Sequence, residues 1–195
     1  MTALVTVGCS TVTELPQEPG SSFTAGPSRS SVTTVDRPDT VPSPTRVVVP
    51  AIDVDEELIG LGLTETGEME VPSDFGDVGW FTDGGRPGGY GPTVLAGHLD
   101  SKTGPAVFDR LPDLAVGETV TLFDDARGAA EYRVTAIGDY AKDEFPTTDV
   151  FGATVTDEIR LITCSGDFDS TVGSYERNVV VFGVRIRPVL EKAPG

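Results

Sequence analysis

The sequence has few of the residues on which several large protein classes depend. Its 195 residues include two cysteines, Cys9 and Cys164, and one histidine, His98. Two cysteines cannot form the disulfide framework of a small secreted domain, although a single bond between them is conceivable. One histidine excludes any mechanism that needs two imidazoles, including the usual histidine-rich zinc sites. The acidic residues do not have the spacing of an EF-hand loop.

Basic residues, aromatic residues and long apolar runs are also scarce. The chain has 14 Lys and Arg against 31 Asp and Glu, and its net charge of -17 argues against nucleic acid as a partner because phosphate backbones are repelled. No window of about 20 apolar residues is present that could span a bilayer. With 7% aromatic residues, 23 glycines and 15 prolines, the composition favours short strands and turns over a helical bundle.

The first 45 residues differ in composition from the rest. Of the 36 residues in 10–45, 22 are Ser, Thr, Pro or Gly, so we expect 1–45 to be a disordered tail. The short apolar run that ends at Gly8 and Cys9 resembles the end of a bacterial lipoprotein signal, but it lacks the basic start. It is either the remnant of a longer signal, with Cys9 as the lipidated residue, or a chance match. Contact with a membrane is expected only through such an N-terminal anchor.

The folded domain is expected at 46–188, followed by a tail at 189–195. Its apolar segments are short and bounded by Gly, Pro and Asp, which predicts seven or eight strands in about 140 residues and therefore a closed barrel or a sandwich. Short helices are expected near 106–111 and 147–151. The predicted strands are 46–49, 69–71, 93–98, 119–123, 130–137, 158–164 and 178–186.

Alternation along the last two predicted strands indicates which side chains face inward. In 178–186 the even positions are apolar and are expected inside: Val180, Phe182, Val184 and Ile186. Arg177 then faces outward. In 158–164, Ile159 and Leu161 suit the interior, so Cys164 is also expected outside. The alternation thus predicts that Cys164 and Arg177 share one surface, where a guanidinium would favour the thiolate.

His98 ends the predicted strand 93–98 and could join the same site. An imidazole is well suited to donate a proton to a leaving amine, and a cysteine nucleophile needs such a partner. Taken singly, a lone cysteine is more often a small buried side chain, and a lone histidine is more often merely hydrogen-bonded. Both interpretations stay open on these residues alone.

The local sequence around all three residues resembles that of the sortases, the bacterial cysteine transpeptidases. Leu161-Ile162-Thr163-Cys164 resembles their Leu-x-Thr-Cys signature. Arg177 lies 13 residues after Cys164 and before an apolar run, as the catalytic arginine of sortases does. Gly97-His98 matches the Gly-His pair that sortases carry well upstream of the cysteine. The likeness covers about 46–187.

Within that family, the segments 96–101, 104–108 and 163–169 are most similar to the actinobacterial class F. One departure concerns the arginine, which in that class often directly follows the tyrosine equivalent to Tyr175. Here Glu176 follows the tyrosine and Arg177 comes next.

The resemblance implies a sortase barrel of about eight strands on the outer surface of a Gram-positive bacterium. It implies transpeptidation at a Leu-Pro-x-Thr-Gly-like sorting signal of surface proteins, with peptidoglycan or another amine as acceptor. Cys164 would be the nucleophile, His98 the acid and Arg177 the oxyanion donor, with no metal or organic cofactor. The alternatives are a surface-tethered, non-catalytic β-barrel binding module with a buried Cys164, and a hydrolytic thiol protease.

Overall fold

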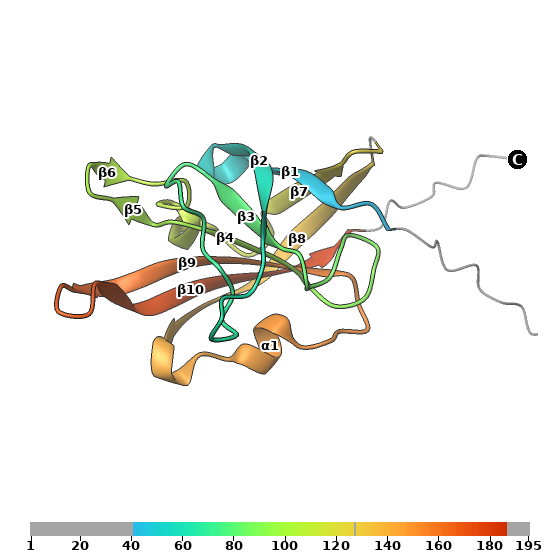
Figure 1. Cartoon of the computed structure of the whole chain (residues 1–195). Helices are drawn as coiled ribbons and strands as arrows, with labels where there is room; N and C mark the ends of the chain where they lie inside the picture. Colours follow the sequence, from blue (N-terminus) through green and yellow to red (C-terminus); the bar gives the residue numbers. More distant parts are fainter. Residues whose placement is uncertain (1–40, 127, 187–195) are drawn as a thin grey trace, which may run out of the picture. The chain divides into compact units, whose positions relative to one another are not determined.

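A computed structural model describes residues 41–126 and 128–186. Within these residues, eight strands close into a barrel (Figure 1) in the spatial order β1-β2-β3-β4-β9-β10-β8-β7. Neighbouring strands run antiparallel, except for the parallel pairs β2–β3 and β4–β9. The prediction of a mainly β, closed eight-strand barrel is confirmed.

The elements have these bounds. The barrel strands are β1 (Pro44–Val49), β2 (Val54–Leu61), β3 (Val78–Phe81), β4 (Thr93–Gly97), β7 (Thr119–Asp124), β8 (Ala129–Ala141), β9 (Glu158–Asp169) and β10 (Ser174–Arg185). A two-stranded arm consists of β5 (Asp100–Ser101) and β6 (Gly104–Pro105). The helical segments are α1 (Thr147–Phe151) and the 3-10 turns η1 (Pro50–Ile52), η2 (Leu111–Asp113) and η3 (Lys142–Glu144).

The predicted tails fall almost wholly outside the described residues, as does Cys9. Residues 44 and 45 of the predicted N-terminal tail belong to β1, because this strand begins at Pro44. No helix in the described part of the chain is long and apolar enough to cross a bilayer.

Two barrel strands, β2 and β3, and the two short strands of the arm, β5 and β6, were not predicted, and two predicted elements are wrong. β2 has three consecutive exposed acidic residues, Asp55 to Glu57, so it shows no alternation. β3 has only four residues and contains Gly79, where a Cβ atom would lie 2.3 Å from Leu61 Cδ1. The segment 69–71 forms only an isolated bridge between Leu63 and Met69.

The expected helix at 106–111 is a series of turns, whereas the one at 147–151 is confirmed as α1. Phe108 and Leu111, both fully buried, insert between the strands and contribute to the core. Turn hydrogen bonds from Asp109 N to Ala106 O and from Leu111 N to Phe108 O hold this segment.

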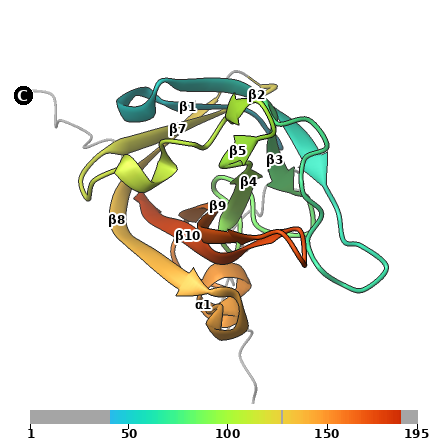
Figure 2. The same cartoon turned by 90° about the vertical axis from the view of Figure 1, so that its left-hand side faces the viewer.

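The β9–β10 sheet is buried on both faces. Leu161, Val179 and Val181 belong to the main core inside the barrel. Ile162 and Val180 belong to a second apolar cluster with Val150 of α1, which lies outside the barrel beside β8, β9 and β10 (Figure 2).

The prediction that the even residues of β10 face the interior is therefore wrong. Val180 and Phe182 pack in the cluster beneath α1, and Val184 is partly exposed. Because both faces are apolar, this strand reads as a continuous apolar run, and alternation cannot assign its faces. The inward direction predicted for Ile159 and Leu161 is confirmed, since both belong to the main core.

Candidate active site

Cys164 of β9 and His98, the residue after β4, lie at the same end of a parallel strand pair. Ala96 of β4 pairs with Ile162 of β9, and each candidate lies two residues beyond its member of that pair. Residues two apart on a strand point to the same face. The register therefore places the backbones of Cys164 and His98 at the same end of the β4–β9 pair, with Cys164 on the face of Ile162.

His98 is held at the end of β4 by contacts on both sides. Its backbone oxygen accepts a hydrogen bond of 2.9 Å from Phe108 N. Gly97 before it has no room for a side chain, since a Cβ atom would lie 2.7 Å from Phe108 Cδ2. The absence of a side chain at Gly97 thus lets the 107–108 segment pack tightly beneath the histidine.

The imidazole itself contacts the connection between β2 and β3. His98 Nε2 lies 2.7 Å from the backbone oxygen of Pro72, and its ring centroid lies 4.8 Å from that of Phe75. A carbonyl oxygen only accepts hydrogen bonds, so Nε2 carries the proton of this bond. Nδ1 is then the nitrogen left for another partner.

Cys164 is a free, half-buried thiol on β9. Burial raises the pKa of its thiol above the ordinary cysteine value; the charge of Lys142 lowers this pKa, and the charge of Asp100 raises it. These two charged groups, which the sequence interpretation did not single out, are the ones that act on the thiol. Asp100 follows His98 by only two residues, which is the one sequence signal that could have indicated it.

Arg177 does not share a face with Cys164, and the prediction that it does is wrong. In the β9–β10 register Arg177 lies opposite Ser165, and Asn178 lies opposite Cys164. Residues directly opposite each other in an antiparallel pair share a face. From this pair to Val184–Glu158 the pairing is unbroken, so Arg177 lies on the face of Val179 and Val181, the opposite of the face that alternation predicts.

On its own face, Arg177 is paired with Asp139 of β8. Arg177 Nε lies 3.1 Å from Asp139 Oδ1, and Nη2 lies 2.8 Å from the backbone oxygen of Asp139. Ser165 donates a 2.7 Å hydrogen bond to the same carboxylate oxygen. The register thus places Cys164 and His98 at the same end of the β4–β9 pair, whereas the Arg177 guanidinium belongs to a separate polar network.

Tyr175 connects the β9–β10 hairpin to the segment that follows His98. Its hydroxyl donates a short hydrogen bond to Asp100, which is the main reason that its pKa is raised to about 12. The ring also packs edge-on against Phe168, at a centroid distance of 5.2 Å. This bond joins the two chain segments that carry the candidate nucleophile and the candidate acid.

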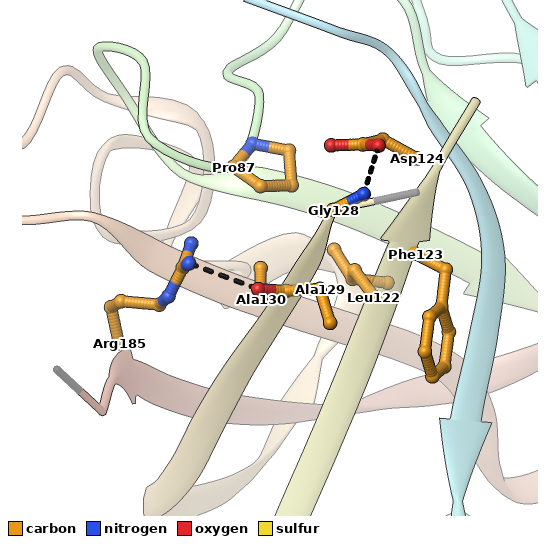
Figure 3. A pocket seen from close by; sticks show the side chains of 8 residues that line it. All are labelled: Pro87, Leu122, Phe123, Asp124, Gly128, Ala129, Ala130 and Arg185. Atoms are coloured by element: carbon orange, nitrogen blue, oxygen red, sulfur yellow. Dashed lines mark hydrogen bonds between the residues drawn. The ribbon is translucent and has the colours of Figure 1, made fainter. Parts of the chain in front are cut away.

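A cavity of about 160 Å³ lies at the other end of β8 and β10 (Figure 3). It is lined by apolar residues of β7 and β8, by Asp124 and by Arg185, whose guanidinium donates to the backbone oxygen of Ala129. It contains no nucleophile. Across 41–126 and 128–186, no group of three or more His, Cys, Asp or Glu side chains is arranged to hold a metal ion.

Comparison with known proteins agrees with this fold. Among solved structures, sortase C-1 from Actinomyces oris (formerly Actinomyces naeslundii) has 23% identity and a TM-score of 0.54, over 73% of this chain and 71% of that chain. Sortase C1 from Streptococcus agalactiae has 24% identity and a TM-score of 0.56, over 75% and 68%. Sortase A from Corynebacterium diphtheriae has 18% identity and a TM-score of 0.54, over 77% and 64%. These similarities show a shared fold.

Comparison with curated proteins gave no match. A family model described as sortase domain matches residues 47–186, which is well over half of the chain. The chain therefore belongs to the sortase family, whose members are generally extracytoplasmic cysteine transpeptidases acting on proteins that carry sorting signals.

Proposed function

We propose that this protein cleaves a Leu-Pro-x-Thr-Gly-like sorting signal between Thr and Gly and transfers the acyl group to an amine acceptor on the cell surface. The supporting observation is the register of β4 and β9, which puts Cys164 and His98, the residue after β4, at the same end of this strand pair. The segments around both residues further suggest that the protein is most similar to actinobacterial class F.

In the first half-reaction, the Cys164 thiolate attacks the carbonyl carbon of the signal's threonine. The carbon–nitrogen bond to glycine then breaks as a proton passes from the His98 imidazolium to the departing amine. The products are a thioester on Cys164, a neutral imidazole and a free glycine amine. Because Nε2 of His98 is bonded to Pro72 O, Nδ1 is the atom from which this proton is donated.

Arg177 is proposed to stabilise the negative oxygen that develops on the threonine carbonyl. To do so, its guanidinium must exchange Asp139 for the substrate oxygen. The side chain is 39% exposed, so it can rotate at the rim of the sheet without leaving a buried cavity. A single oxyanion donor is typically worth about 100- to 1,000-fold in rate.

In the second half-reaction, an acceptor amine attacks the thioester carbonyl and returns its surplus proton to His98, while Cys164 leaves as thiolate. A peptidoglycan amine or another surface amine is the proposed acceptor. Water can replace the amine as a side reaction. These steps need no metal or organic cofactor.

The test is an assay with a Leu-Pro-x-Thr-Gly peptide library and a large excess of a glycine-based amine, followed by mass spectrometry. We expect an amine-captured product from the parent and none from Cys164→Ala. Cys9→Ser is the matched control, because it removes the other thiol of the chain and is expected to retain full activity. Turnover by Cys164→Ala at the parent rate would overturn the nucleophile assignment.

The same assay separates the two alternative functions. A thiol protease would give only the hydrolysed acid, even with excess amine. A binding module would leave the peptides intact, and its Cys164 would not react with a peptide carrying a thiol-reactive group at the scissile position. Either result would contradict the proposed transpeptidation.

A further inference from the structure

We propose that Tyr175 and Asp100 are positioning residues, whose hydrogen bond holds the chain segment that begins at His98 against the β9–β10 hairpin and thereby fixes the imidazole for its proton transfer. The inference deepens the proposed function and rests on it, since it takes Cys164 as the nucleophile and His98 as the acid. Neither positioning residue needs to touch the substrate for this role.

His98 lies beyond the end of β4, where the barrel no longer holds it. The pairing of β4 with β9 ends two residues earlier, at Ala96 and Ile162. The imidazole is bonded to Pro72 O, and the backbone oxygen of His98 accepts a hydrogen bond from Phe108 N. Both partners belong to connecting segments and not to β9 or β10. The position of the imidazole relative to the thiol therefore depends on how these segments are held against β9 and β10.

The segment 98–108 is a closed arm that begins at His98. The residues joined across it, from the base to the tip, are His98 and Phe108, Leu99 and Ala106, Asp100 and Pro105, and Ser101 and Gly104. The two bonds at the base have donor–acceptor distances of 2.9 Å and 3.1 Å. Because the arm is joined along its whole length, a contact that holds Asp100 also holds His98, only two residues away.

The β9–β10 hairpin projects beyond the barrel at the end where this arm lies (Figure 1). β8 pairs with β10 only as far as Arg177, whereas β9 and β10 pair with each other out to Asp169 and Ser174. The projecting part begins with a bulge, in which residues 166 and 167 of β9 face a single residue of β10. Gly166 has a φ of 77° there, which a glycine adopts without strain. Such a bulge re-aims the side chains that follow it.

Tyr175 lies directly past the bulge and reaches the arm. It pairs with Phe168, and its hydroxyl donates a short hydrogen bond to the carboxylate of Asp100. The ring packs edge-on against Phe168, at 5.2 Å between centroids, which restricts the direction of the hydroxyl. The bond to Asp100 is the main cause that raises the pKa of Tyr175 to about 12, in agreement with a hydroxyl that stays a donor. The bond thus joins β10, the strand paired with that of Cys164, directly to the arm of His98.

The first measurement is amide hydrogen exchange of the full chain by NMR, which needs no turnover. Tyr175→Phe removes the donor and keeps the ring, so the amides of Ala106 and Phe108 should exchange about 3- to 10-fold faster, because the arm opens more often. Tyr132→Phe is the matched control, since it also removes a tyrosine–aspartate hydrogen bond, at the other end of the β8–β10 pair. It should leave both exchange rates unchanged. Parent exchange rates in Tyr175→Phe would overturn the inference.

The second measurement is the single-turnover acylation rate of Cys164 with two substrates. In the Leu-Pro-x-Thr-Gly peptide the departing amine needs a proton from His98, whereas in a Leu-Pro-x-Thr aryl thioester the thiolate leaves without one. Tyr175→Phe should slow acylation by the peptide about 10-fold, because the acid is misplaced, and should change acylation by the thioester less than about twofold. Tyr132→Phe should keep both parent rates.

A double-mutant cycle tests whether the two residues act through one bond. Asp100→Ala should also slow acylation by the peptide more than acylation by the thioester. Tyr175→Phe combined with Asp100→Ala should lose no more than Asp100→Ala alone, because both substitutions remove the same bond. Additive losses, or equal losses with the two substrates, would overturn the inference. If the parent itself cleaves no peptide, the proposed function fails, and the exchange rates of Ala106 and Phe108 still decide whether Tyr175 holds the arm.

Discussion

Arg177 is bonded to Asp139 through both its Nε atom, 3.1 Å from Oδ1, and its Nη2 atom, 2.8 Å from the backbone oxygen. The two side chains are 39% and 50% exposed. A pair as exposed as this contributes about 0–1 kcal/mol to stability. Exchange of the carboxylate for a substrate oxygen would therefore cost little stability, but the guanidinium would also have to leave the face of Ser165 to reach the thiol.

Arg177→Lys should lower kcat/KM by about 100- to 1,000-fold, because lysine keeps the charge but loses the planar pair of donors. The melting temperature should change little, since the pair with Asp139 is exposed. Peptide-cleavage kinetics and thermal unfolding of the same preparations measure the two effects.

Two other arginines serve as controls for Arg177. Arg160 is 4% exposed, bonded to Glu158 and to the backbone oxygens of Asp149 and Ile159, so Arg160→Lys should lower stability. Arg185 lies at the far end of β10 from Arg177, so Arg185→Lys should retain the parent rate constants. If Arg177→Lys has near-parent kinetics while folded Arg160→Lys is inactive, the oxyanion donor is Arg160.

The barrel could be predicted from the sequence because most of its strands are short apolar segments between turn residues. β2 could not, because its consecutive acidic residues Asp55 to Glu57 follow no two-residue period. The faces of β10 could not be assigned either. α1 covers the outside of that strand, so its odd-numbered and its even-numbered positions are both apolar.

The candidate site could be predicted only in part for a similar reason. Cys164 and His98 lie in short local motifs, and both come to the same end of the parallel β4–β9 pair. The face of Arg177 could not be predicted, because both faces of β10 are apolar, and its partner Asp139 comes from a third strand. Lys142 and Asp100, whose charges act on the pKa of Cys164, belong to other elements, and no spacing pattern links them to the cysteine.

Gly97→Ala should disturb both the fold and the site. The new Cβ atom would lie 2.7 Å from Phe108 Cδ2 and 2.8 Å from Val107 Cγ1, so the buried Phe108 and the partly buried Val107 must move. We expect a loss of about 1–3 kcal/mol in the free energy of unfolding. Because His98 is the next residue, peptide cleavage should also fall. Urea unfolding and cleavage kinetics provide the measurements.

Gly76→Ala is the control for Gly97→Ala. Its Cβ atom would meet Asp74 Oδ1 at an ordinary contact distance of 3.5 Å. Its effect on the free energy of unfolding should stay within about 0.5 kcal/mol. Equal effects of the two substitutions would contradict the packing constraint at Gly97.

Tyr132 should make the barrel sensitive to alkaline pH. Its ring is fully buried and its hydroxyl donates to Asp157 Oδ1 at 2.9 Å; burial, then the neighbouring Asp157, raises the tyrosine pKa far above its ordinary value. The unfolded chain loses this proton at about pH 10 and the folded chain does not. The contribution of Tyr132 to stability should therefore be constant below about pH 10 and fall as the pH rises beyond it.

Tyr132→Phe tests this dependence. It should lower stability at neutral pH by about 1 kcal/mol through the lost hydrogen bond, and it should flatten the alkaline decline. Tyr90→Phe, at a position 79% exposed, should leave the decline as in the parent. Urea unfolding at several pH values from 8 to 11 measures the decline in the free energy of unfolding. A decline in Tyr132→Phe as steep as in the parent would contradict the role of Tyr132.

The pH dependence of turnover tests the proposed pairing of Cys164 with His98. If the active form holds a thiolate and an imidazolium, the rate should rise with pH as Cys164 ionises and fall as His98 loses its proton, which gives a bell-shaped profile. Burial raises the pKa of Cys164, so the fraction of the enzyme that holds a thiolate together with an imidazolium should be small, which lowers the height of the profile. His98→Gln keeps an amide that can donate to Pro72 O but cannot transfer a proton, and His98 is the only histidine of the chain. We expect this variant to remain folded, to lose nearly all turnover and to lose the falling limb in any residual activity. A His98→Gln variant with the parent rate and the parent profile would rule out the imidazole as the acid.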